Sequence, residues 1–416
     1  MRSLAGWLEF IERQHPQPIA LGLERVTQIL KQMKIKLDCP VISVAGTNGK
    51  GSTCAMLESI LRAAGYRTAL YTSPHLVRYN ERVRIAGAEV SDALLAEGFA
   101  AVEAARAATP LTYFEFGTLA ALHLFSADSP DAVVLEVGLG GRLDAVNAID
   151  ADCAVLTSVG IDHVEFLGPD REAIGREKAG IFRAGRPAVV AEPDPPQSVL
   201  EAEGVKLFLG KDFGYSAERE QWSYWGPGGR RGGLAHPALR GKLQLRNAAA
   251  AMCALDALHA KLPVGMNEVR RGLAEVSLAG RFQVLPGRPQ VILDVAHNPQ
   301  AAKTLAANLA DAGFAPETIA VCGMLRDKDI AGVLRELAPR ITRWHFATLA
   351  GPRGASASQL IEFLPFGEAR EFVTPAAAFE AAAMRAGQDD KIVVFGSFLT
   401  VGEVIAWLNN NKTSKR

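Results

Sequence analysis

A glycine-rich segment with one lysine and two hydroxyls is the part of the sequence best suited to chemistry. The segment VISVAGTNGKGST, residues 41–53, runs from an apolar stretch into glycines and then into Lys50, Ser52 and Thr53. Glycines let the backbone turn tightly and point successive N–H groups inward, and a helix that begins there adds free donors. A lysine in such a loop reaches the outer phosphates of a nucleotide, and a hydroxyl faces Mg²⁺. The alternative is an ordinary strand–helix turn, but these residue types together favour a nucleoside-triphosphate site.

Further polar residues follow other apolar stretches in the N-terminal two thirds of the chain. Ser73 follows LYT, Glu136 ends AVVLEV, Asp162 and His163 follow VLTSVG, and Lys178 lies in the predicted helix around REKAG. A carboxylate that ends a buried strand in a phosphate-loop protein is the expected place for a Mg²⁺ ligand or a water-positioning base. Each residue also has a structural alternative: Glu136 as a helix cap or surface group, His163 as a core or capping histidine, Lys178 as a solvated side chain. The glycines after Glu136 favour close approach of the backbone to a ligand.

Two polar residues close an apolar stretch near the C-terminal end. Asp294 and His297 end VILDVAHN, and Arg281 precedes them in the Gly- and Pro-rich stretch 277–290. Asp and Asn are common in turns, so turn chemistry is one interpretation of this motif, and a surface charge is one interpretation of Arg281.

Alternation of apolar strands with helical patterns predicts an α/β protein with parallel sheets covered by helices on both faces. We expect an ATP-binding domain over residues 1–280 with a mostly parallel sheet, a linker over 281–290, and a smaller Rossmann-like α/β domain over 291–416. The aromatic, Gly-rich stretch 213–235 predicts a small β-excursion. The C-terminal domain should hold four strands, VILDVAHN, TIAVCGM, RWHFATL and KIVVFGS, each followed by a helix, before a disordered tail NNNKTSKR.

The composition is that of a globular protein without a bulk charge. The 416 residues are 49% hydrophobic and 22% charged, and a chain of this length predicts two domains. Lys and Arg number 45, as do Asp and Glu, which argues against a protein held to nucleic acid by bulk charge. Five scattered cysteines without a C-x-x-C pair indicate neither a disulfide framework nor a zinc site. With no signal-peptide or membrane-spanning pattern, we expect a cytoplasmic protein without a membrane or nucleic-acid partner.

Taken together, the motifs resemble those of a known family. AGTNGKGS, TSPHL with NERVRI, TYFEFGT, LEVGLGGRLDAVN, SVGIDHVEFLG, REKAGI, RNAAAA, AGRFQ and DVAHNP occur in order, with GSF near the end. This series resembles the folylpolyglutamate synthase/dihydrofolate synthase branch of the ATP-dependent amide ligases, which also include the cell-wall Mur enzymes. The TYFEFGTLAALHLF segment is similar to the bifunctional bacterial form.

The resemblance implies a role for each matching position. Ser73 and Glu136 would hold one Mg²⁺ and His163 a second, supported by Lys178 as an N6-carboxylysine (a carbamate). Carbamylation needs the neutral amine, which a buried site favours. The implied catalytic residues are Lys50, Lys178, His163 and His297. The implied ATP-binding residues are Gly46, Thr47, Asn48, Gly49, Lys50, Gly51, Ser52, Asn247, Arg281 and Asp294. The implied pteroate-binding residues are Pro18, Ile19, Ala20, Thr112, Tyr113, Phe114, Glu115 and Leu143.

The implied reaction uses ATP and two Mg²⁺ ions to join L-glutamate to 7,8-dihydropteroate or to reduced folates through an acyl phosphate, in an enzyme expected to be a monomer. One departure concerns the pterin contact, because related bacterial enzymes often carry an acidic residue where this chain has Ala20. The alternatives are a monofunctional folylpolyglutamate synthase and a Mur-type cell-wall ligase. The second is disfavoured because only 40 residues precede Val41, too few for the extra domain of those ligases.

Overall fold

The fold consists of two α/β units. The computed structural model describes residues 2–17 and 19–413. The first unit contains Tyr79–Ala238, Gln244–Val276 and the described residues up to His75. The second contains Leu76–Arg78, Leu239–Leu243 and the described residues from Ser277 onward. Pro18, one of the residues implied in pteroate binding, lies outside the described residues.

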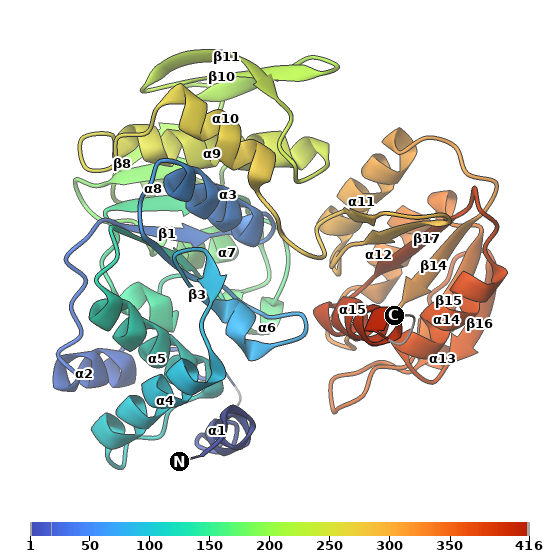
Figure 1. Ribbon diagram of the computed structural model, residues 1–416, viewed down its shortest axis with the longest axis horizontal. Helices are drawn as coiled ribbons and strands as arrows, with labels where there is room; N and C mark the ends of the chain where they lie inside the picture. The colour runs from blue at the N-terminus through green and yellow to red at the C-terminus, as the bar shows by residue number, and fades with distance from the viewer. Residues whose placement is uncertain (1, 18, 414–416) are drawn as a thin grey trace. The chain divides into compact units, whose positions relative to one another are not determined.

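An eight-stranded sheet forms the centre of the first unit (Figure 1). Its strands are fully buried apolar runs wherever they lie in the middle of the sheet, as expected for parallel strands covered on both faces. Strand β3 pairs antiparallel with both β2 and β4, and all other neighbours pair parallel. In spatial order the strands are β4 (Ala88–Glu89), β3 (Val83–Ile85), β2 (Thr68–Tyr71), β5 (Ala132–Glu136), β1 (Val41–Ala45), β6 (Cys153–Leu156), β7 (Pro187–Val190) and β8 (Val205–Phe208).

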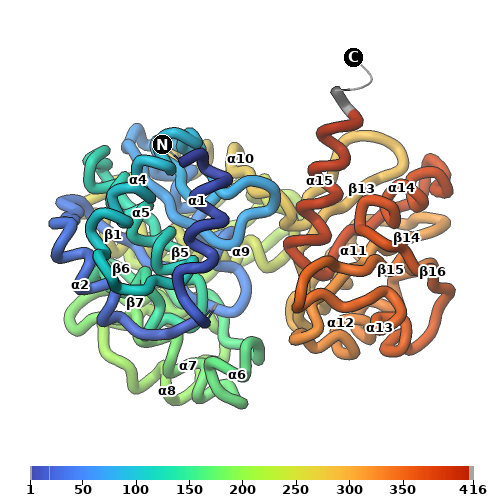
Figure 2. The backbone as a smooth tube through the Cα atoms, turned by 90° about the horizontal axis from the view of Figure 1, so that it is seen from below, coloured from blue at the N-terminus to red at the C-terminus, as the bar shows by residue number. Residues whose placement is uncertain are grey.

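Helices cover both faces of this sheet. One layer, α1, α2, α4 and α5, shares a hydrophobic core with β2 and β5, and α1 lies beside α4 (Figure 2). On the other side α3 packs on β1, β2 and β5 and against α10. The helices are α1 (Leu4–Ile11), α2 (Glu24–Gln32), α3 (Lys50–Ala63), the 3₁₀-helix η1 (Tyr79–Arg82), α4 (Asp92–Arg106), α5 (Tyr113–Asp128), η2 (Ala145–Ala148), α6 (Val164–Leu167), α7 (Arg171–Ala179), α8 (Gln197–Glu201), α9 (Lys242–Ala257) and α10 (Met266–Glu275).

The predicted β-excursion over 213–235 is a separate antiparallel sheet. It consists of β9 (Gly214–Ala217), β10 (Gln221–Gly226) and β11 (Gly229–Ala235), and β11 contacts α10. A buried polar cluster ties this sheet to α9: Tyr224 Oη donates to Asp256 Oδ2 over 2.6 Å, and Arg231 pairs with Asp256 Oδ1 over 2.6 Å.

The second unit is built on a six-stranded sheet. Five strands run parallel and β12 pairs antiparallel with β13 at one edge. This Rossmann-like arrangement and the mostly parallel sheet of the first unit confirm the predicted fold class. The strands, in spatial order, are β12 (Gln283–Leu285), β13 (Gln290–Leu293), β17 (Lys391–Phe395), β14 (Thr318–Cys322), β15 (Arg343–Ala347) and β16 (Glu368–Phe372). The helices are α11 (Pro299–Asp311), α12 (Ile330–Leu337), η3 (Ala338–Arg340), α13 (Ala357–Glu362), α14 (Pro375–Arg385) and α15 (Phe398–Thr413).

Three local predictions in the C-terminal region were wrong. The linker predicted over 281–290 contains β12, because Phe282 is buried and Val284 packs on the core of the sheet despite the Gly- and Pro-rich sequence. Strand β16 and helix α14 were missed, since EAREF is mostly charged and lies at the sheet edge, where it is only partly buried. The tail predicted to be disordered begins inside α15, which continues through Thr413.

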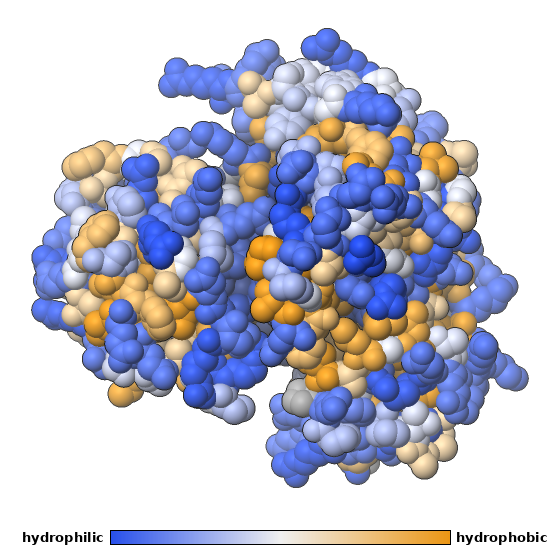
Figure 3. Space-filling model, turned by 180° about the vertical axis from the view of Figure 1, so that it is seen from behind, coloured by the Kyte–Doolittle hydropathy of each residue, from blue (hydrophilic) through white to orange (hydrophobic). Residues whose placement is uncertain are grey.

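One face of the protein is seen in the space-filling view of Figure 3. In the view of Figure 3 hydrophilic residues dominate, with scattered hydrophobic patches. Within the described residues, no helix combines the length and the apolar character needed to span a bilayer.

Candidate active site

The phosphate-loop residues connect the end of β1 to the start of α3. Gly46 and Gly49 have φ values of 151° and 93°, in the region that favours glycine. A Cβ atom on Gly49 would lie 2.6 Å from Asn247 Oδ1, so Asn247 on α9 packs directly against the loop. Lys50 is the first residue of α3, and its Nζ donates to Gly46 O over 3.0 Å. The predicted ATP-binding residues of the first unit are therefore gathered at one turn.

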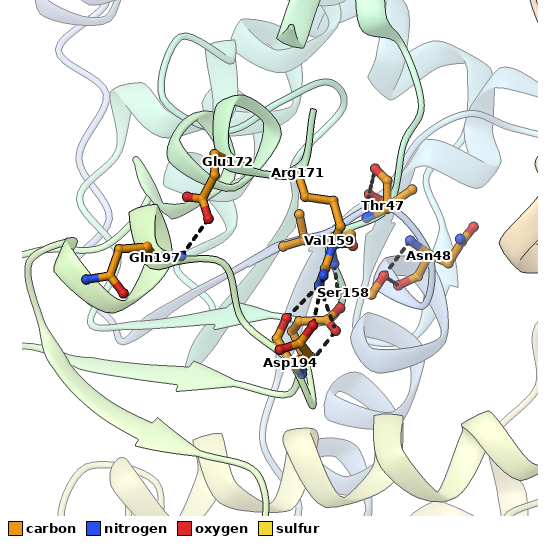
Figure 4. Close-up of polar contacts among 10 residues, drawn as sticks. Thr47, Asn48, Ser158, Val159, Arg171, Glu172, Asp194 and Gln197 are labelled. Carbon is orange, nitrogen blue, oxygen red and sulfur yellow. Dashed lines mark hydrogen bonds and ion pairs between the residues drawn. The ribbon is translucent and has the colours of Figure 1, made fainter. Parts of the chain in front are cut away.

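A segment after the neighbouring strand β6 braces this loop (Figure 4). Thr47 N donates to Ser158 O over 2.9 Å, and Thr47 Oγ1 exchanges hydrogen bonds with Gly160 N and O. Asn48 N donates to Ser158 Oγ over 2.9 Å, and Asn48 O accepts from Thr157 Oγ1 over 2.7 Å. The backbone of Thr47 and Asn48 is thus fixed by the 157–160 segment, which leaves the glycine N–H groups of the loop to turn toward an anion.

Glu136 ends β5 next to the phosphate loop. Its Cα pairs in register with that of Val44, two residues before Gly46, and its side chain is buried. Ser73, after the adjacent strand β2, donates its backbone N–H to Glu136 Oε2 over 3.2 Å. The structure thus brings together the two residues predicted to hold one Mg²⁺.

Lys178 is buried in the last turn of α7, and burial followed by the nearby Lys50 charge lowers its pKa to about 7. Asp162 and Asp144 act in the opposite direction. Within the described part of the chain, no hydrogen bond or ion pair engages the Lys178 amine. A group with this pKa is substantially neutral at physiological pH, the form that carbamylation requires.

His163 lies three residues beyond the segment that braces the phosphate loop. It has φ 52° and precedes α6, and its backbone N donates to Asp162 Oδ1 over 2.9 Å. About a third of its side chain is exposed. The same loop therefore braces the nucleotide-binding turn and presents His163.

These residues fit a hard divalent cation. No group of three or more His, Cys, Asp or Glu side chains that could form a metal site occurs among residues 2–17 and 19–413. Mg²⁺ usually takes one or two protein carboxylates and completes its shell with waters and substrate phosphates. The buried Glu136 carboxylate beside Ser73 matches this donor chemistry, and a carbamate on Lys178 would supply an anionic oxygen donor for the second ion.

The described pteroate-binding candidates surround the start of α5. Thr112 caps the helix in a capping box with Glu115, and the buried Glu115 carboxylate forms an ion pair with Arg25 over 2.8 Å. Arg25 also donates to Ala20 O over 2.8 Å. Glu115 thus fixes the loop that carries Ile19 and Ala20.

Three further contacts are made in this region. Gly22 N donates to Leu143 O over 3.2 Å, which joins the N-terminal loop to the loop after β5. The Phe114 ring packs against Gly138, where a Cβ would lie 2.5 Å from the ring. Tyr113 stacks edge-on against Tyr79 with ring centroids 5.7 Å apart.

The candidates from the C-terminal region cluster within the second unit. Asp294, after β13, accepts from Phe282 N and Ala296 N, each over 2.8 Å, and burial raises its pKa. The guanidinium of Arg281 lies 5.1 Å from the centroid of the Phe398 ring, and the His297 ring centroid lies 6.2 Å from the same ring.

Comparison with known proteins identifies the family. The model of the Mur ligase middle domain matches residues 44–255, and that of the Mur ligase glutamate ligase domain matches residues 280–398. The Escherichia coli dihydrofolate synthase/folylpolyglutamate synthase is 47% identical over 97% of this chain and 94% of its own length. The chain belongs to the dihydrofolate synthase/folylpolyglutamate synthase family of Mur ligases. The resemblance inferred from the motifs is confirmed.

Solved structures of this family share the fold over the whole chain. E. coli FolC in complex with DHPP and ADP is 45% identical with a TM-score of 0.95 and covers 99% of both chains. The Yersinia pestis bifunctional folylpolyglutamate synthase/dihydrofolate synthase complexed with AMPPNP and Mn ion is 47% identical with a TM-score of 0.91, covering 98% of each chain.

Sequence reasoning missed several residues of the site. Asp144 is buried beside Lys50 and Lys178, and burial raises its pKa to about 6. The sequence could have indicated Asp144 as a candidate, because this residue follows a glycine-rich turn in LGGRLDAVN. Glu192, which ends AVVAE as Glu136 ends AVVLE, was available from the same pattern.

Proposed function

We propose that this chain is an ATP-dependent amide ligase that adds L-glutamate to 7,8-dihydropteroate, giving dihydrofolate, and to the γ-carboxyl group of reduced folates. The main support is the 47% identity, over nearly the full length of both chains, to an E. coli protein named for both activities. The bound AMPPNP and Mn ion of the Y. pestis relative support ATP and a divalent metal ion as requirements of this chain.

The first step transfers a phosphoryl group. A carboxylate oxygen of the acceptor attacks the γ-phosphorus of ATP, the bond to the β-phosphate oxygen breaks, and ADP leaves an acyl phosphate behind. Lys50 and the backbone N–H groups of the phosphate loop stabilise the charge on the transferring group. Ser73 and Glu136 would hold one Mg²⁺, and His163 with a carbamylated Lys178 a second, and these ions would neutralise further charge on the phosphates.

The second step forms the amide. The neutral amine of L-glutamate attacks the carbonyl carbon of the acyl phosphate, inorganic phosphate leaves, and the amine loses a proton. We propose that His297 acts close to the reacting groups. We also propose that Asn247, Arg281 and Asp294 contact ATP. The acceptor would lie against the start of α5, next to Phe114 and the loop that carries Ala20.

A paired assay tests the proposal. ADP release and glutamate incorporation are measured with dihydropteroate as acceptor, then with tetrahydrofolate, and in each case with ATP, Mg²⁺ and L-glutamate. We expect turnover with both acceptors and its loss in Lys50→Ala. Activity with tetrahydrofolate alone would reduce the assignment to a monofunctional folylpolyglutamate synthase. ATP hydrolysis that ignored both acceptors and glutamate would refute it.

A further inference from the structure

Glu192 and Arg171 hold the segment that braces the phosphate loop, although neither touches that loop. Glu192 follows β7 and is buried, and its Oε2 accepts from Val159 N over 2.8 Å. Arg171, the first residue of α7, donates from Nε to Val159 O over 3.2 Å. Both backbone polar groups of Val159 are therefore held by this pair of side chains. Figure 4 shows Arg171 beside Val159.

The two side chains also bind each other and a shared neighbour. Arg171 Nη2 lies 3.3 Å from Glu192 Oε1, and Arg171 donates from Nη1 to Asp194 Oδ2 over 3.0 Å and from Nη2 to Asp194 O over 2.5 Å. Arg246 on α9 contributes a second positive charge near Glu192. The orientation of the guanidinium is therefore fixed, because its nitrogen atoms bind Glu192, Asp194 and the Val159 carbonyl at the same time.

Val159 lies between Ser158 and Gly160, which form hydrogen bonds with the phosphate loop, as Thr157 also does. Ser158 bonds Thr47 and Asn48, and Gly160 exchanges two hydrogen bonds with Thr47 Oγ1. A change in the position of Val159 is therefore transmitted to the backbone that is to surround the phosphates. The Val159 side chain also packs in the hydrophobic core with Leu156 and Leu167, so packing and the two polar side chains together set its position.

We propose that Glu192 and Arg171 are positioning residues for nucleotide binding. They fix Val159, so that Ser158 and Gly160 keep the phosphate loop in its anion-binding form. This inference deepens the proposed function, on which it rests for the identity of the nucleotide, but it concerns ATP binding and not the choice of acceptor.

The test is the affinity for the ATP analogue AMPPNP with Mg²⁺, measured by calorimetry. Glu192→Ala removes the acceptor for Val159 N and should raise the Kd about tenfold, the effect expected for the loss of one charge-assisted hydrogen bond. Glu192→Gln keeps an acceptor oxygen but loses the charge pair, so a rise of about threefold is expected. Arg171→Lys keeps the charge without the fork and should fall between these two.

Glu58→Gln is the matched control. Glu58 is also a buried glutamate paired with an arginine, Arg84, over 3.2 Å, but it has no contact with the 158–160 segment. We expect this variant to lower Tm and to leave the Kd of AMPPNP within about twofold of the wild-type value.

The pattern of kinetic constants separates positioning from plain stability. In Glu192→Gln the KM for ATP should rise while the KM for dihydropteroate stays unchanged. The proposal is overturned if Glu192→Gln and Arg171→Lys lower Tm as the control does but leave the Kd of AMPPNP unchanged. It is also overturned if Glu192→Ala, folded by circular dichroism, binds AMPPNP as tightly as the wild type. Failure of the proposed function is distinguishable, because it would appear as missing amide formation in the wild type with AMPPNP binding intact.

Discussion

Replacing Lys178 with methionine should stabilise the protein and abolish ligation. Methionine has a similar length and no charge, so it fills the space of the lysine stem in the last turn of α7 without burying a cation. Burial, and then the charge of Lys50, lower the pKa of Lys178 from 10.5 to about 7, which means that the native state disfavours its protonated form. A residue that destabilises the fold and is nevertheless needed for activity is expected at an active site.

The size and the pH dependence of the effect follow from this pKa. A pKa lowered from 10.5 to about 7 corresponds to about 5 kcal/mol in the free energy of unfolding. This pKa already includes the attraction of the amine to Asp144 and Asp162, so we expect a gain of up to about 5 kcal/mol below about pH 7. Below pH 7 both native and unfolded chains carry the proton, and the native state bears the full cost.

The stabilising effect of the substitution becomes smaller as the pH rises above about 7. Between pH values of about 7 and 10.5 the unfolded wild-type chain binds more protons at Lys178 than the native chain, so wild-type stability rises with pH across this window. The variant lacks this contribution. Its advantage over the wild type should therefore be largest below about pH 7 and should fade toward pH 10.5.

Urea unfolding in CO₂-free buffer, at about pH 6 and about pH 9, measures the effect on both chains. Lys211→Met, at an exposed position, is the control and should change stability by less than about 0.5 kcal/mol at either pH. Equal gains at both pH values, or a loss at both, would refute the conclusion that burial lowers the pKa of Lys178 to about 7. Ligation at the wild-type rate in Lys178→Met would remove Lys178 from the mechanism whatever its stability.

Three further variants probe other parts of the fold. Gly49→Ala places a Cβ 2.6 Å from an amide oxygen at φ 93°, so ATP turnover should fall at least about a hundredfold with the fold retained by circular dichroism. Glu115→Gln weakens the ion pair with Arg25 and should cost about 1–3 kcal/mol in urea unfolding and raise the KM for dihydropteroate but not for ATP. An unchanged KM for dihydropteroate would make Glu115 purely structural. Tyr224→Phe removes the hydroxyl that donates to Asp256 and should lower stability by about 1–2 kcal/mol without altering kcat, and a fall in kcat would link the small sheet to catalysis.

The sequence was sufficient to predict the architecture of both units because their strands are apolar and continuous. VISVA, AVVLE and CAVL are buried at every position. Such a continuous apolar run can be recognised in the sequence without knowing which strands lie beside it. The wrong assignments all concern elements without that property. The strand EAREF pairs only at a sheet edge, where charged side chains reach solvent, and its hydrogen bonds come from a neighbour that local sequence does not reveal.

The sequence predicted where the candidate site lies better than it predicted which side chains contact one another there. Strand ends in a parallel sheet meet at one edge, which is enough to place Ser73 and Glu136 near the phosphate loop. The roles of Asp144 and Lys178 depend on burial and on charges from segments far apart in the chain. Glu115 matches a position that the family resemblance implies in acceptor binding, yet its carboxylate is engaged by Arg25 and the helix cap. The pattern therefore identified a residue whose observed contacts are to the protein itself.

Glu136 and Glu192 show why such roles require the structure. Each ends a run of the form AVVxE at the carboxyl end of a buried parallel strand, and local sequence gives both the same prospects as a metal ligand. Glu136 lies in register with the strand that enters the phosphate loop, whereas Glu192 ends a strand two positions further along the sheet, next to β6. At that distance its carboxylate meets the backbone of Val159 and the fork of Arg171 before any phosphate. Strand order depends on the crossover connections and not on the residues of the strand itself. It therefore decides whether a carboxylate at the end of a strand faces the nucleotide site or bonds the segment that braces the phosphate loop.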